Sequence, residues 1–448
     1  MITVDNREGF SLRISRILSR EPSQHVDIYF FLPGELGFSA RVMSEGDFFH
    51  NAIYVKRTYH STRHQLPLVY SRLASRSRLS PERYRLDLSL YAYQYVVALE
   101  RQARALQSRN DASSEELLEL SELCQGILRR LRRHQPGEER LEKYYFNIDN
   151  YLSWLTEQSV LALAMHVEQH EHAHEGRQAL MDLAAQERRH REEKNYNSSR
   201  AMDNPSRMSN KMRLLRRLIE YPITLREKRQ ELGKMEEKGV KALAAGLVMV
   251  VVSVLMFEAR SVLGDLTLRF FLALAVMYAA REVFKEDLRD TLWRWLRRGR
   301  PKWRSQYYDN FSGDMVARAL EWFDYSRYQR LPDDIRRTRR GNMVKREEHV
   351  LHYRNHTMLS PGRFLKGYYH TREVIIVDLQ FVARLMDPGS FDVYRLDDEG
   401  NIQRDEVEKR YQVNLVVKTR QGDDIELKRW KITMNRSRIV DIEAVGSP

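Results

Sequence analysis

The chain has 448 residues, with 75 Lys and Arg residues against 62 Asp and Glu residues, and therefore a formal net charge of +13 at pH 7. At roughly 150 residues per domain, this length is enough for about three domains that each bury a core. An apolar fraction of 42% beside 31% charged residues excludes a polytopic transporter and a low-complexity chain. Cys124 is the only cysteine, which excludes an intrachain disulfide framework and agrees with a reducing compartment.

The first 70 residues have the pattern of β-strands. FSLRISRIL alternates apolar and polar residues, HVDIYFFL is rich in β-branched and aromatic residues, and Pro33 followed by Gly supplies a turn. We therefore predict an N-terminal β-rich element over residues 1–70.

Helical signals replace the strand signals from Ser80, which is followed by Pro and Glu as at a helix start. Ser113 opens a capping box, and a third long helix is expected to begin near Asp149. These signals predict an antiparallel helical bundle over residues 80–194. The Asn-, Ser- and Pro-rich stretch that follows predicts a linker over residues 195–212.

Two apolar stretches in the middle of the chain are the strongest signal in the sequence. Residues 242–257 contain no charged residue, and residues 266–280 contain one charged residue, Arg269. The first stretch spans about 24 Å as a helix, against a hydrocarbon core of about 30 Å, and Lys241 can snorkel at its end. We predict a transmembrane helical hairpin over 241–281, preceded by juxtamembrane helices over 213–240. The alternative is a buried helical hairpin in a soluble domain.

Basic residues are concentrated on both sides of this hairpin. Six lie within residues 221–241 and nine within 281–304, whereas the short loop 258–265 has one. Because basic residues stay on the cytoplasmic side during insertion, this asymmetry places both long ends in the cytoplasm. Tryptophans interleave with the arginines after the second stretch, as at a lipid headgroup interface. The residues predicted to contact headgroups are Lys238, Lys241, Trp293, Arg294, Trp295, Arg297, Arg298, Arg300 and Trp303.

The remaining third of the chain changes from mixed signals to strands. Residues 282–360 combine helical patterns with basic clusters, and we expect an amphipathic, basic connector there. Alternation with period two from Val374 onward, with turn residues between the runs, predicts a C-terminal antiparallel β domain over 361–448. The basic clusters lack any nucleic-acid-binding signature, so a bilayer with anionic headgroups is the simpler partner.

Histidines form the only pattern that suggests a metal. His166, His170 and His174 are four residues apart, so on one helix they share a face that could hold Zn²⁺. His170 and His174 with Glu171 also match H-E-x-x-H, in which the glutamate is the general base of a zinc peptidase. The neighbouring residues are charged, unlike those around zinc-peptidase motifs, so we interpret this stretch as a solvated helix face and expect no cofactor. A second set, His349, His352 and His356, has the spacing of one helical face.

Together these patterns predict an α+β membrane protein with an N-terminal β element, a cytoplasmic helical bundle, a two-helix transmembrane hairpin and a C-terminal antiparallel β domain. We expect it to be integral to a cell membrane, the inner membrane if the source is bacterial, with both termini cytoplasmic and no N-terminal signal peptide. The expected function is a scaffold, sensor or regulatory protein without catalytic activity, assembling as a homo-oligomer or with other protein subunits through its hairpin and bundle. The alternatives are a membrane-bound zinc-dependent hydrolase and a nucleic-acid-binding membrane protein.

Overall fold

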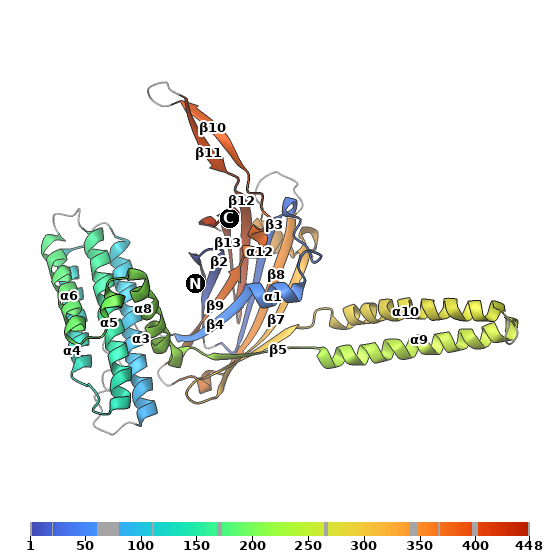
Figure 1. Cartoon of the computed structure of the whole chain (residues 1–448), viewed down its shortest axis with the longest axis horizontal. Helices are drawn as coiled ribbons and strands as arrows, with labels where there is room; N and C mark the ends of the chain where they lie inside the picture. Colours follow the sequence, from blue (N-terminus) through green and yellow to red (C-terminus); the bar gives the residue numbers. More distant parts are fainter. Residues whose placement is uncertain are drawn as a thin grey trace.

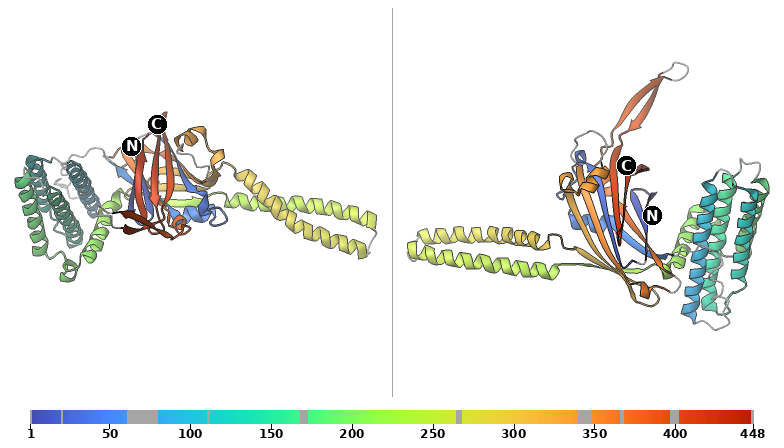
Figure 2. Two further views of the ribbon diagram at one scale, coloured as in Figure 1. Left: turned by 90° about the horizontal axis from the view of Figure 1, so that it is seen from above. Right: turned by 180° about the vertical axis from the view of Figure 1, so that it is seen from behind.

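A central body of β-strands carries a helical bundle on one side and a pair of long helices on the opposite side in the computed structural model (Figure 1). The views in Figure 2 show the same separation from two further directions. Both chain ends lie in the β body (Figure 1). The structure describes residues 2–19, 21–60, 80–109, 112–167, 173–263, 268–339, 348–365, 368–396 and 402–446.

The larger of the two main sheets has eight antiparallel strands in the order β14-β13-β12-β3-β8-β7-β6-β5. Its strands are β3 (Ser23–Pro33), β5 (Arg226–Glu231), β6 (Trp303–Tyr308), β7 (Met315–Arg327), β8 (Glu348–Leu359), β12 (Tyr411–Gln421), β13 (Asp424–Met434) and β14 (Ile439–Val445).

A smaller antiparallel sheet has the order β1-β2-β9-β4, and a two-stranded ribbon projects from the body. The sheet contains β1 (Ile2–Glu8), β2 (Ser11–Leu18), β4 (Ile53–His60) and β9 (His370–Asp378), and the ribbon contains β10 (Ser390–Leu396) and β11 (Ile402–Glu408). Burial alternates residue by residue along β9 and β6, as expected where one face of a strand packs on a core. Side chains of both sheets belong to one hydrophobic core.

The N-terminal and C-terminal strands, expected as separate parts, form one body. β3 pairs with both β8 and β12, and β2 pairs with β9. The expected connector over 282–360 contains three adjacent strands of the larger sheet, β6, β7 and β8. Alternation identifies a strand, but its partner depends on packing between distant segments, which explains why the separate parts were expected.

The helical bundle consists of long antiparallel helices. They are α3 (Pro81–Gln107), α4 (Ser114–Arg132), α5 (Glu139–His166), α6 (His174–Glu193) and α8 (Pro205–Glu220). The capping box at Ser113 is confirmed, because its side chain accepts from the backbone N–H of Glu116 and the Glu116 carboxylate accepts in return from the N–H of Ser113. The third helix begins at Glu139, ten residues before the expected start.

Four shorter α-helices lie outside these long elements in the described residues. They are α1 (Glu45–Ala52), α7 (Ser199–Met202), α11 (Asp333–Arg339) and α12 (Gln380–Ala383). The stretch expected as a linker over 195–212 therefore contains α7 and the start of α8. Asn204 caps α8 and Pro205 takes its first position, so the residues that suggested a loop are helix-start residues.

Both groups of long helices are insertions between strands. The bundle lies between β4 and β5, and the helices α9 (Lys234–Leu263) and α10 (Leu268–Arg297) lie between β5 and β6. β5 and β6 are neighbours in the larger sheet, with Glu231 opposite Trp303. The range 213–240, expected as juxtamembrane helices, is helical at both ends, in α8 and α9. Between these two helices, however, the charged segment REKRQE is the edge strand β5, because its backbone groups pair with β6.

Candidate membrane-anchoring site

Helix α9 carries apolar side chains that the rest of the structure leaves exposed. Its segment Lys234–Ser261 has a mean hydropathy of 2.4 over its most apolar window, of which 11% is buried. Val250 and Phe257 are 64% and 69% exposed. Within the described residues it is the one helix long and apolar enough to cross a membrane. A core helix of a soluble protein would bury most of this surface.

Helix α10 lies beside α9 in the opposite direction (Figures 1 and 2). Glu236 near the start of α9 faces Arg297 and Arg300 at distances of 3.8 and 3.9 Å, which sets the register of the two helices at their base. The first half of α10 is apolar apart from Arg269, but charged residues recur from Arg281 onward. By length and composition, therefore, α10 does not match α9 as a membrane span.

The base of the helix pair is fixed to the sheet by Arg297. Its Nη2 donates to the carbonyl oxygen of Leu232 at 2.7 Å, and its guanidinium lies 5.4 Å from the centre of the Trp293 ring. Gly233 beside it has φ +98°, and a Cβ there would lie 2.8 Å from Arg297 Cζ. The turn from β5 into α9 thus requires glycine at this position.

Most of the side chains predicted to contact headgroups are exposed around this base. Lys238, Lys241, Arg294, Arg298 and Arg300 are exposed, and Trp295 is 74% exposed. Some are also engaged within the chain, since Lys241 pairs with Glu237 at 2.8 Å.

Trp303 does not lie where the sequence pattern placed it. It was expected among the interfacial residues, but it is the first residue of β6 and is only 3% exposed. Its ring stacks on Phe49 of α1, with the ring centres 3.7 Å apart. Alternation along β6 turns this side chain into the core, and the nearby arginines gave no sign of that.

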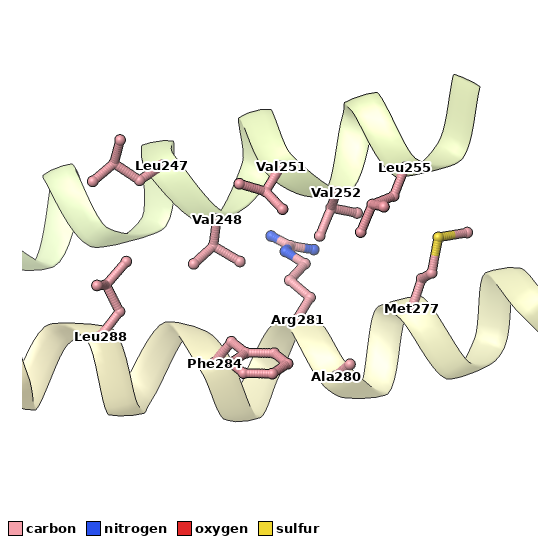
Figure 3. A pocket seen from close by; sticks show the side chains of 10 residues that line it. All are labelled: Leu247, Val248, Val251, Val252, Leu255, Met277, Ala280, Arg281, Phe284 and Leu288. Carbon is pink, nitrogen blue, oxygen red and sulfur yellow. The ribbon is translucent and has the colours of Figure 1, made fainter. Parts of the chain in front are cut away.

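An apolar cleft of about 320 Å³ lies between α9 and α10, and Arg281 is the only charged residue that lines it (Figure 3). The guanidinium points from α10 toward Val251 and Val252 of α9 (Figure 3). Its Nε is buried and has no hydrogen-bond partner in the part of the chain that the structure describes. The ring centre of Tyr278 is 5.3 Å from Arg281 Cζ. The sequence had placed Arg281 only at the end of the expected hairpin.

The histidines of the expected metal site do not share one helix. His166 is the last residue of α5 and His174 is the first of α6, so the expectation of a single helix face through both is wrong. α5 and α6 pack against each other in the bundle, which buries an apolar face of each and requires the chain to turn. His170 and Glu171 lie outside the described residues. No group of three potential metal ligands occurs within the described ranges.

The histidines expected on a C-terminal helix face are corrected to strand β8. Residues of a strand alternate between faces, so His352 and His356 share one side and His349 takes the other. His352 Nε2 lies 2.9 Å from Asp27 Oδ1, and the His356 ring stacks on His25 at 4.0 Å. Burial and the neighbouring His356 lower the pKa of His25 to about 4, so the His25 ring is uncharged at neutral pH.

The β body contains a buried ionic cluster that no sequence pattern indicated. Glu373 of β9 accepts from Arg16 Nε of β2 at 2.5 Å and from Arg57 Nη2 of β4, which also donates to Thr357 of β8 in the other sheet. Arg57 and Glu373 have fully buried side chains. Burial alone would raise the pKa of Glu373, but the two guanidinium groups outweigh it and hold the pKa below its usual value. The cluster links the inner faces of the two sheets.

A second ionic cluster lies inside the bundle. Asp149 accepts from Arg132 Nε at 3.1 Å and from the Tyr196 hydroxyl at 2.8 Å, and His190 Nε2 lies 2.8 Å from the same carboxylate. Arg132 also makes two bonds to Glu187. Burial would raise the pKa of Asp149, but the hydrogen bond from His190 and the charge of Arg132 hold it below its usual value. These contacts tie α4, α5 and α6 together.

The exposed apolar helix α9, with α10 and their basic base, is thus the surface that most needs a partner outside the chain. Comparisons with protein families, with curated proteins and with solved structures find no match to this chain.

Proposed function

We propose that this is a membrane-anchored scaffold, sensor or regulatory protein without catalytic activity, held in the bilayer by α9 and α10 as a transmembrane hairpin. The observation that carries the proposal is the exposure of α9: its most apolar window is 11% buried although its mean hydropathy is 2.4. So much apolar surface in water is unfavourable, at about 25 cal/mol per Å², and a bilayer would cover it.

We infer the orientation from the charges at the base. Lys238, Arg294 and Arg298 are exposed where the helices leave the β body, which supports a cytoplasmic β body and bundle with anionic headgroups at the base. We propose cytoplasmic chain termini for the same reason, since both lie in the β body (Figure 1).

Assembly through the membrane helices belongs to the same proposal. Glu282 and Glu286 are exposed on α10, and they lie on its charged half, beside the apolar run of α9. A second copy would remove these carboxylates from lipid. Size measurement in mild detergent tests this: we expect an oligomer, and a monodisperse monomer would contradict it.

Membrane insertion itself is tested by charge substitution. Val250 and Val254 lie one helical turn apart and are 64% and 57% exposed. The Val250→Asp, Val254→Asp double variant should be released by alkaline carbonate, because each central aspartate costs about 2.5–3.5 kcal/mol in a membrane helix. The wild type should stay in the membrane pellet.

The matched control is Leu214→Asp on α8, because Leu214 is equally exposed, at 62%, but lies outside the membrane helices. It should stay in the pellet as the wild type does. Release of the wild type by carbonate would refute the anchor.

A further inference from the structure

The position of Arg281 conflicts with the simple transmembrane hairpin. The cleft places its side chain against Val248, Val251 and Val252, which lie near the middle of the apolar run 242–257. A charged group held against this apolar surface is unfavourable unless another group compensates its charge. The compensating group has to be anionic and has to reach the space between the two helices.

No residue lining the cleft supplies this anion, because all of them except Arg281 are apolar. Glu282, the next residue, attracts Arg281, but it is exposed and hydrogen-bonded to Lys285 at 2.8 Å. Arg281 Nε is buried without a hydrogen-bond partner in the described part of the chain, so one donor of a planar fork remains open. A guanidinium of this kind binds phosphate oxygens well, since two N–H groups can donate side by side.

The walls of the cleft indicate the rest of the ligand. Leu247, Leu255, Met277, Phe284 and Leu288 line the cleft beside the three valines. Its volume of about 320 Å³ is within the usual range of ligand pockets, roughly 300–1,000 Å³. A ligand that fits must therefore combine one anionic group with an apolar chain.

We propose that the cleft binds one anionic glycerophospholipid, with its phosphate on Arg281 and an acyl chain along the apolar wall. This proposal rests on the membrane anchoring proposed above. It differs from general attraction to headgroups because it assigns lipid selectivity to one residue. A zwitterionic lipid is a poorer ligand, since its own cation already compensates the phosphate charge.

The test is a titration of the full-length protein in mild detergent with phosphatidylglycerol and with phosphatidylcholine, followed by native mass spectrometry. We expect the wild type to prefer phosphatidylglycerol, and Arg281→Gln to weaken its binding by about tenfold or more, as for the loss of hydrogen bonds to a charged group. Arg281→Lys should retain part of the preference, since it keeps the charge and loses the fork.

The control is Arg189→Gln, because Arg189 is an exposed cation on α6 of the bundle and does not line the cleft. It should bind both lipids as the wild type does. Flotation of every variant with phosphatidylcholine vesicles shows whether the helices still insert.

Three results would overturn the lipid site while leaving the anchor intact: a wild type without lipid preference, an Arg281→Gln variant that keeps it, or displacement of the lipid by inorganic phosphate at equal concentration. If Arg281→Gln dissociates an oligomer and leaves lipid binding unchanged, Arg281 pairs with a carboxylate of a second copy instead. If the wild type does not float with vesicles of either lipid, both the anchor and the lipid site are rejected.

Discussion

At the scale of single residues, Glu373 is the carboxylate on which the polar interior of the β body depends. It compensates Arg16 and Arg57, whose side chains are 2% and 0% exposed. The Glu373→Gln variant would leave both guanidinium groups buried without the carboxylate that they contact directly. We expect the free energy of unfolding to fall by about 3–5 kcal/mol, measured by urea denaturation in detergent.

A matched ion pair in the same sheet serves as the control. Asp5 of β1 accepts from Arg13 Nε of β2 at 2.7 Å, but the two side chains are 43% and 27% exposed. Asp5→Asn should therefore cost no more than about 1 kcal/mol. If Glu373→Gln and Asp5→Asn lowered the free energy of unfolding by similar amounts, burial would not explain the contribution of the Glu373 cluster.

At the scale of elements, the turn between β5 and α9 determines how α9 and α10 leave the sheet. In Gly233→Ala, the new Cβ would approach Arg297 Cζ to 2.8 Å in a backbone conformation with φ +98°. We expect the free energy of unfolding to fall by about 1–3 kcal/mol. We also expect faster proteolysis at the base, because the bond from Arg297 to Leu232 must shift.

Gly239→Ala is the corresponding control within α9. No atom lies within 4 Å of the Cβ it would add, and alanine favours a helix over glycine by about 1 kcal/mol. This variant should be as resistant to proteolysis as the wild type or more so. Equal sensitivity of both variants to proteolysis would argue that the contact between Gly233 and Arg297 does not hold the base of the helices.

At the scale of the whole molecule, the β body separates the bundle from α9 and α10 (Figures 1 and 2). Because β5 and β6 are adjacent and antiparallel, the inserted helices can be removed without breaking the sheet. The backbone N–H of Leu232 donates to the carbonyl oxygen of Lys302 at 2.9 Å. The two residues on either side of a two-residue hairpin turn are bonded in the same way.

Replacing residues 233–301 with Asn-Gly should therefore give a folded protein that is soluble without detergent. Gel filtration and far-ultraviolet circular dichroism of the purified variant check this, and we expect a monodisperse species that retains strand and bundle signals. An aggregated product would mean that the β body needs α9 and α10 in order to fold. A variant with the same turn placed after Lys228 is the control, because it removes half of β5 and should destabilise the sheet edge.

The sequence by itself determined the features that depend on neighbouring residues. The cap at Ser113 needs only Glu116 three positions later, and the apolar run in α9 needs only its own composition. The alternation in β9 likewise identifies a strand from nearest neighbours. A helix cap, an apolar surface and a strand are each specified within a few residues, so local patterns were sufficient.

Only the tertiary structure decided which distant segments meet. Arg57 and Glu373 are 316 residues apart, and nothing around either one indicates the other. Trp303 is buried because β6 pairs between β5 and β7. Arg281 became a candidate ligand-binding residue only when the register of α9 and α10 placed it against the apolar middle of α9. Strand partners and helix register depend on the summed packing of remote surfaces, which no local pattern contains.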